Sequence, residues 1–156
     1  MKQVLAFIFV VALLPVQAQK INKKLQQQLE ILITGFKGDV GMYVKDLHTG
    51  KFASINADSI FPTASMVKVP ILIGIMDKLN KGEFKYHQEL TYKDSLFYAG
   101  SDLLASLKNN EKVELSKVIM LMLTTSDNTA SLWCQSLAGT GVAINNLMAQ
   151  YGLQHT

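Results

Sequence analysis

The stretch Phe61-Pro62-Thr63-Ala64-Ser65-Met66-Val67-Lys68 decides how this 156-residue chain is interpreted. It contains the pattern Ser-x-x-Lys, and Ser126-Asp127-Asn128 follows 61 positions after the serine of that pattern. Either pattern alone is weak, because Ser-x-x-Lys is common by chance and Ser, Asp and Asn are frequent in turns. The ordered pair is more informative, since each pattern adjoins an apolar stretch that predicts a helix.

The first pattern suits nucleophilic chemistry. If a helix begins near Thr63, Ser65 and Lys68 lie one turn apart on the same face. A serine hydroxyl is a weak nucleophile until a base takes its proton, and a lysine can be that base where its surroundings favour the neutral amine. The backbone N–H of Ser65, in a first helical turn, could donate to a developing oxyanion. The alternative is a serine at a helix start beside a solvated lysine.

The second pattern could complete such a site. Ser126 would supply a second hydroxyl that relays a proton to a leaving nitrogen, and Asn128 an amide that bonds the amide of a substrate. Asp127 is interpreted as a helix cap. The alternative for all three residues is an ordinary turn between two helices.

Composition excludes several other classes of function. The net charge is +3, and all 15 basic residues are lysines scattered among 12 acidic ones, whereas a nucleic-acid-binding protein clusters its basic residues. Cys134 is the only cysteine, lies in an apolar stretch and is predicted to be a buried small hydrophobe. His87 and His155 show no metal-ligand spacing. We therefore expect no nucleic-acid partner, no metal and no cofactor.

The first 18 residues predict a secretory signal peptide. Lys2 gives a positive start, residues 4–14 are apolar, and Val16 and Ala18 are small residues at the positions that a signal peptidase reads. We expect cleavage after Ala18 and a periplasmic or secreted product without a stable membrane anchor. The alternative is an uncleaved membrane anchor, which is less favoured because the apolar run is shorter than a membrane-spanning helix requires.

Periodicity predicts one hairpin and several helices. Apolar residues at three- and four-residue steps predict an amphipathic helix over 21–36, and alternation predicts antiparallel strands over 40–45 and 51–57. Four further helices are predicted over 71–79, 115–123, 129–137 and 142–151. The first of these is so apolar that we expect it to be buried on every face, with a kink or an irregular start at Pro70. No segment after Ala57 clearly predicts a strand. The fold class is therefore α/β of the α+β kind, with a helical region and an incomplete antiparallel sheet.

These motifs together resemble the N-terminal half of a class A β-lactamase or related penicillin-binding serine hydrolase. The resemblance rests on Ser-x-x-Lys with its Phe-Pro lead-in, on residues 126–130 (Ser-Asp-Asn-Thr-Ala), and on the Gly-Thr-Gly break at 139–141. It covers residues 19–156, which are interpreted as the N-terminal part of one β-lactamase-like catalytic domain.

The resemblance also implies roles for particular residues. Ser65 would be the acylated nucleophile, Lys68 its proton-transfer partner and Ser126 the proton shuttle. Asn128 would contact the substrate side chain, and Tyr98 would form an aromatic wall. The implied function is hydrolysis of β-lactam antibiotics through an acyl-enzyme, by a monomer whose partner is a small β-lactam. The alternatives are a D-Ala-D-Ala peptidase or penicillin-binding protein, and a non-catalytic fragment.

Two elements of the resembled family are not found among the 156 residues. One is the acidic residue that activates the deacylating water, and the other is the Lys-Thr-Gly strand. His48-Thr49-Gly50 resembles a variant of that triplet, but it precedes Ser65 and is predicted to be the turn of the hairpin. We therefore expect residues 19–156 alone to hydrolyse no β-lactam.

Overall fold

The computed structural model describes residues 20–100 and 102–153. The predicted signal peptide and His155 lie outside these ranges. The contacts divide the chain into two compact units, Met1–Phe61 and Pro62–Thr156, which are described separately below.

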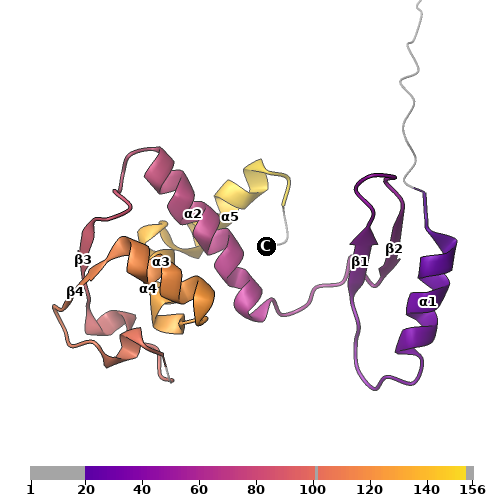
Figure 1. The fold of residues 1–156 in the computed structure, drawn as a ribbon, viewed down its shortest axis with the longest axis horizontal. Coiled ribbons are helices and arrows are strands. Elements are labelled where there is room, and N and C mark those ends of the chain that lie inside the picture. Colours follow the sequence, from indigo (N-terminus) through magenta and orange to yellow (C-terminus); the bar gives the residue numbers. More distant parts are fainter. Residues whose placement is uncertain (1–19, 101, 154–156) are drawn as a thin grey trace, which may run out of the picture. The chain divides into compact units, whose positions relative to one another are not determined.

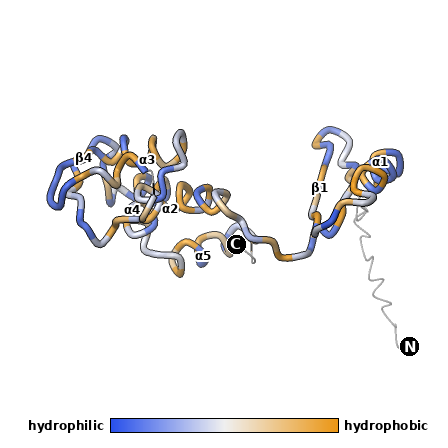
Figure 2. Tube along the Cα trace, turned by 90° about the horizontal axis from the view of Figure 1, so that it is seen from below, coloured by the Kyte–Doolittle hydropathy of each residue, from blue (hydrophilic) through white to orange (hydrophobic). Residues whose placement is uncertain are grey.

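The first unit is one helix laid along a hairpin (Figure 1). The helix is α1 (Lys23–Ile33), and the strands β1 (Met42–Lys45) and β2 (Phe52–Ile55) pair antiparallel as predicted. The side chain of Gln26 ties α1 to β2, because its amide donates to the carbonyl of Ser54 at 3.0 Å and accepts from the N–H of Ser54 at 2.9 Å. Figure 2 shows that α1 carries both hydrophobic and hydrophilic residues, as an amphipathic helix does.

The hairpin turn is held by Asp46. Its carboxylate accepts the backbone N–H groups of His48 and Thr49 and the Thr49 hydroxyl, and Gly50 adopts a φ of +69°. The hydrogen bond from the Thr49 hydroxyl is the main reason that the pKa of Asp46 lies below its usual value. His48-Thr49-Gly50 is therefore a turn, as predicted.

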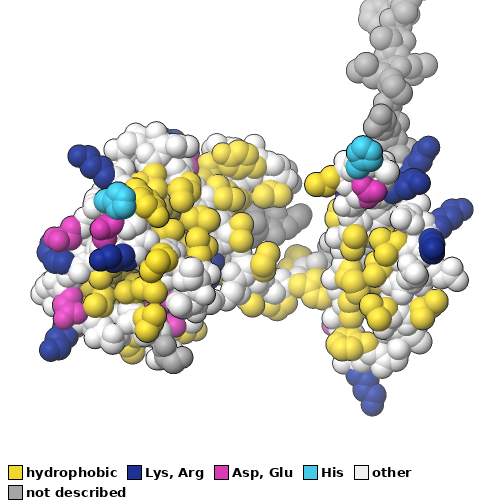
Figure 3. All heavy atoms as spheres, in the orientation of Figure 1, with side chains coloured by type: hydrophobic (Ala, Val, Ile, Leu, Met, Phe, Trp, Pro, Cys, Tyr) yellow, Lys and Arg dark blue, Asp and Glu magenta, His cyan; other side chains and the backbone are white. Residues whose placement is uncertain are grey.

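This unit leaves much apolar surface open. Figure 3 shows hydrophobic side chains gathered over the hairpin on the face in view. Among residues 20–61, the exposed large apolar side chains are Ile21, Ile31, Leu32, Phe36, Tyr43, Val44, Leu47, Ile60 and Phe61.

The second unit is mainly helical. Its helices are α2 (Lys68–Asn80), α3 (Leu115–Thr124), α4 (Asn128–Leu137) and α5 (Thr140–Gln150), and its strands are β3 (Glu89–Thr91) and β4 (Lys112–Glu114). Single 3-10 turns lie at Ala64–Val67, Asp94–Leu96 and Leu104–Ser106. No helix within the described ranges is long and apolar enough to cross a membrane.

The core of this unit forms where α4 packs against α2, α3 and α5. Its members include Ile71, Ile75, Leu115, Val118, Met122, Trp133, Cys134, Ile144 and Met148. The rings of Tyr92 and Trp133 meet edge to face with centroids 5.7 Å apart. Gly74 permits a close approach between α2 and the end of α4, because a Cβ added there would lie 3.0 Å from the Cβ of Ala138.

Two predictions about this unit are wrong. First, β3 and β4 form a small antiparallel sheet with Leu90 opposite Val113, in a region where no strand was expected. Strands of three residues are too short to show an alternating pattern. Second, α2 is not buried on every face, since Val69 and Met76 are 48% and 41% exposed.

The irregular start predicted at Pro70 is present and takes the form of the 3-10 turn Ala64–Val67, which runs directly into α2. Pro70 is the third residue of α2, where a backbone N–H has no partner within the helix. The proline therefore removes no α-helical hydrogen bond, and the kink that a mid-helix proline causes does not arise.

Candidate active site

Two chain segments converge to form the candidate site. Ser65 lies on the 3-10 turn Ala64–Val67, and Lys68 is the first residue of α2. Ser126 lies in the turn that follows α3, and Asn128 is the first residue of α4. The Oγ atoms of Ser65 and Ser126 are 2.8 Å apart, although the residues are 61 positions apart in the chain. The structure thus brings together the residues of the two sequence patterns.

Lys68 links the two segments. Its side chain is buried, and its Nζ lies 2.5 Å from the carbonyl oxygen of Ser126, 2.6 Å from Ser126 Oγ and 3.1 Å from Asn128 Oδ1. Ser65 Oγ lies farther away, at 3.5 Å. An ammonium group has three donors, so the three shorter contacts are sufficient to satisfy it. In the part of the chain that the structure describes, no carboxylate forms an ion pair with Lys68.

Two of the residues that combine a Cβ with a positive φ lie at this site. Ala64, which immediately precedes Ser65, has a φ of +44°, and Ser126 itself has a φ of +58°. A residue with a Cβ costs about 1–2 kcal/mol in this left-handed region. Such strain persists only where surrounding contacts fix the conformation, and here the bond from Lys68 to the carbonyl of Ser126 is one of those contacts.

Asp127 is the N-cap of α4, as predicted. It is only 1% exposed, and its carboxylate accepts from the N–H of Ala130 at 2.7 Å and from the N–H of Leu104 at 2.9 Å. A second carboxylate, that of Asp102, accepts from the N–H groups of Asn128 and Thr129 at 2.9 and 3.0 Å. Sequence reasoning missed Asp102, because it lies in a segment without periodicity and far from α4 in the chain.

Tyr98 does lie at the site. A pocket of about 330 Å³ is lined by Ala64, Ser65, Val67, Lys68, Tyr98, Asn128, Ser131 and Leu132. The Tyr98 ring is half exposed, and its backbone N–H donates to Thr129 Oγ1 at 3.2 Å. Ser131 and Leu132 were not foreseen as pocket residues. They follow Asn128 by three and four positions in α4, which is the helical spacing that places residues on one face.

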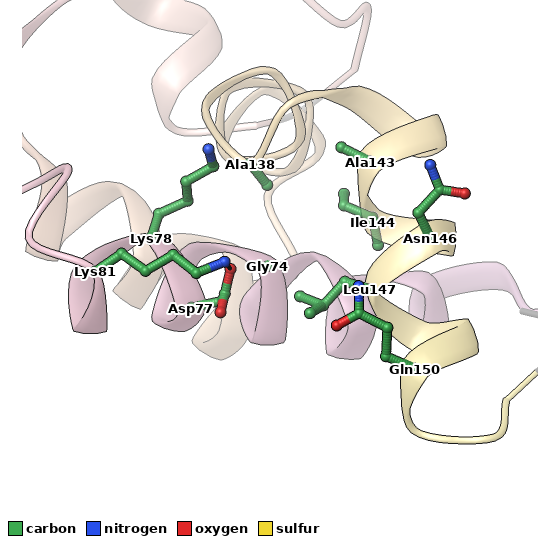
Figure 4. Close-up of a pocket in the computed structure, with 10 residues that line it drawn as sticks. All are labelled: Gly74, Asp77, Lys78, Lys81, Ala138, Ala143, Ile144, Asn146, Leu147 and Gln150. Atoms are coloured by element: carbon green, nitrogen blue, oxygen red, sulfur yellow. Dashed lines mark hydrogen bonds and ion pairs between the residues drawn. The ribbon is translucent and has the colours of Figure 1, made fainter.

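A second hollow, of about 270 Å³, lies between α2 and α5 (Figure 4). Its charged side chains already have partners: Lys81 contacts Asp77 at 2.6 Å, and Lys78 contacts Glu83 at 2.6 Å. Its lining holds neither hydroxyl nucleophile nor histidine, so the chemistry-bearing groups belong to the pocket around Ser65.

Other reactive groups in the described residues lie outside this chemistry. No group of three His, Cys, Asp or Glu side chains there could hold a metal ion. Cys134 is fully buried in the core, as predicted, and this burial raises the pKa of its thiol to about 12. The thiolate, which is the nucleophilic form, is therefore negligible at neutral pH.

The helical unit and its cluster of two serines and a lysine define the serine β-lactamase and penicillin-binding class of fold. The sequence profile described as "Beta-lactamase enzyme family" matches residues 24–156, and the chain belongs to that family. The resemblance and the α+β fold class predicted from the sequence are thereby confirmed.

Individual relatives support this assignment. The structure of PBP-A superposes with a TM-score of 0.83 at 28% identity, over 88% of this chain and 52% of that chain. The TLA-1 extended-spectrum β-lactamase has a TM-score of 0.76 at 20% identity over 83% of this chain and 48% of that chain, which shows the shared fold. The β-lactamase regulatory protein BlaB of Streptomyces cacaoi is 29% identical over 89 residues, which are 56% of this chain and 28% of that protein. The chain therefore spans about half the length of the solved structures it matches and less of the curated protein.

Proposed function

We propose that Ser65 is acylated by β-lactams, and that the protein containing this chain hydrolyses them through that acyl-enzyme. The observation that carries the proposal is the contact of Ser65 Oγ with Ser126 Oγ at 2.8 Å and with Lys68 Nζ at 3.5 Å, in a pocket open to a small molecule.

The distances support a proton path for acylation. In the proposed path Lys68 must act as the free amine, which takes the proton of Ser65 either directly or through Ser126 Oγ, 2.6 Å from Nζ. Ser65 Oγ then bonds to the β-lactam carbonyl carbon, and the carbon–nitrogen bond of the ring breaks. Ser126 gives its proton to the ring nitrogen and regains one from Lys68. Such positioned proton transfer contributes about 10²–10⁴-fold to a rate.

Three further groups would contact the substrate. Lys68 occupies the oxygen of the Asn128 amide at 3.1 Å, so the NH₂ group of that amide is the part left to bond a substrate carbonyl. Tyr98, on the wall of the same pocket, presents an aromatic face to the substrate. The backbone N–H of Ser65, on its 3-10 turn, is the proposed oxyanion donor.

A second candidate is a penicillin-binding peptidase, which is acylated but turns over slowly. The likeness to PBP-A favours it, since its 28% identity and TM-score of 0.83 exceed the 20% and 0.76 of TLA-1. A structure of the L158E mutant of PBP-A is described as an acyl-enzyme complex with penicillin G. Acylation of the serine is common to both candidates, and only the fate of the acyl-enzyme differs.

Labelling with a fluorescent penicillin, together with nitrocefin turnover, tests both candidates on the protein expressed from its own gene. Ser65→Ala should abolish labelling, whereas Ser59→Ala, at an exposed serine of the first unit, should not change it. Lys68→Ala should slow labelling by about 10²–10⁴-fold. Sustained nitrocefin turnover favours the hydrolase, and one stable label per protein favours the peptidase. Covalent labelling that survives in Ser65→Ala would overturn the assignment of the nucleophile.

A further inference from the structure

Asp102 fastens the loop that carries Tyr98 to the start of α4. Its Oδ2 atom accepts from the backbone N–H groups of Asn128 at 2.9 Å and Thr129 at 3.0 Å, and lies 3.5 Å from Thr129 Oγ1. Thr129 Oγ1 in turn accepts from the N–H of Tyr98 at 3.2 Å. The segment that holds Tyr98 and Asp102 is thus joined to the first turn of α4 by hydrogen bonds in which each side both donates and accepts.

This carboxylate does more than an ordinary helix cap would require. The first N–H groups of a helix lack partners within it, and a side chain at the N-cap satisfies one of them. Asp127 already plays that part by accepting from Ala130. Asp102 lies outside the helix, and its carboxylate accepts from the N–H groups of Asn128 and Thr129, the two residues before Ala130. Hydrogen bonds to a carboxylate are shorter and stronger than neutral ones, so the first turn is held firmly.

The residue held most directly is Asn128. Its backbone N–H is bound by Asp102, and its side-chain oxygen is bound by Lys68 at 3.1 Å. Asp102 and Lys68 therefore hold this residue at its backbone and at its side-chain oxygen, and the NH₂ group is the part of the amide that remains for a ligand in the pocket. Fixed donors of this kind lower the cost of ordering on binding.

We propose that Asp102 is a positioning residue that aims the Asn128 amide, and that it thereby sets a preference for β-lactams that carry a side-chain amide. The proposal rests on the function proposed above. Asp102 itself touches neither the Ser65 hydroxyl nor Lys68, and it acts through Asn128.

Acylation kinetics with two substrates test this role in the full protein. Benzylpenicillin has a side-chain amide, whereas 6-aminopenicillanic acid has a free amine in its place. Asp102→Ala should lower the second-order acylation constant about tenfold for benzylpenicillin, since bonds to a charged acceptor are worth about 1.5–3 kcal/mol and tenfold corresponds to about 1.4 kcal/mol. The constant for 6-aminopenicillanic acid should change less than about twofold.

Two variants sharpen the result. Asp102→Asn keeps an oxygen that can accept from Asn128 and Thr129, so it should recover most of the loss while keeping the same direction of preference. This variant decides the question if Asp102→Ala does not fold. Asp94→Ala is the matched control, because Asp94 is an exposed carboxylate of the same segment and should leave both constants unchanged.

The outcomes separate the two proposals. If the unmodified protein is not acylated by either compound, the proposed function fails, and the role of Asp102 fails with it. If the unmodified protein is acylated and the Asp102 variants lose equally with both compounds, Asp102 is merely structural and the positioning role is refuted. Selective loss with the amide-bearing compound supports the role.

Discussion

Replacing Ser126 by alanine and by glycine should separate the strain at this position from its chemistry. Ser126 has a φ of +58°, and its hydroxyl lies 2.8 Å from Ser65 Oγ and 2.6 Å from Lys68 Nζ. Both variants lose the hydroxyl, and both retain the backbone carbonyl that Lys68 contacts. Only glycine relieves the left-handed conformation.

The expected difference in stability follows from two opposing terms. The left-handed conformation costs alanine about 1–2 kcal/mol. Glycine avoids this cost but loses about 0.5–1 kcal/mol through the greater freedom of its unfolded chain. The glycine variant should therefore be more stable than the alanine variant by about 0.5–1 kcal/mol. Their acylation rates with a labelled penicillin should be equally reduced, because neither can relay a proton.

Urea unfolding, compared through midpoints at a shared slope, measures the stability difference. The same pair of substitutions at Ser136, within α4, is the control. There the glycine variant should be about 0.5–1 kcal/mol less stable than the alanine variant, the reverse of the order expected at position 126. An alanine variant at position 126 that equals or exceeds the glycine variant in stability would refute the strain argument. A glycine variant that is acylated at the unmodified rate would remove Ser126 from the proton path.

Three further outcomes are expected. Asp127→Ala should destabilise the protein by about 2–4 kcal/mol in urea unfolding, because it removes a helix cap and leaves the buried N–H of Leu104 unpaired; a loss below about 1 kcal/mol would contradict this account. Cys134 should resist a thiol reagent at pH 8 in the native protein and react at once in urea; since burial raises its pKa to about 12 from 9.0, its contribution to stability is present below pH 9 and lost as the pH rises toward 12. Mass spectrometry of the exported protein should find Gln19 as the first residue, and a product that begins with Met1 in a membrane fraction would overturn the predicted cleavage.

The helices and the hairpin could be predicted because their sequences carry the period of their structure. Alternation over 40–45 and 51–57 predicted β1 and β2, and glycines at 82, 139 and 152 marked helix ends, where each adopts a positive φ. The strands β3 and β4 could not be predicted, because pairing between Glu89–Thr91 and Lys112–Glu114 depends on a contact that no local pattern records.

The candidate site divides in the same way. Ser65, Lys68, Ser126 and Asn128 were found because they form two short patterns, Ser-x-x-Lys and Ser-Asp-Asn, that can be recognised in the sequence itself. Asp102 was missed because its partners are backbone N–H groups, which every residue type supplies. The left-handed conformations of Ala64 and Ser126 were also beyond prediction, since neither residue type favours them.

All five residues of the predicted site lie in the unit Pro62–Thr156, and the unit that ends at Phe61 contributes none of them. Their mutual geometry therefore depends on contacts that natural selection can preserve within one contiguous stretch of the gene. The contacts that join the two serines, the lysine and the asparagine all lie within residues 62–153, so selection on this geometry acts directly on that stretch. Among descendants of this sequence, residues 62–153 should therefore accumulate amino-acid substitutions more slowly than residues 20–61.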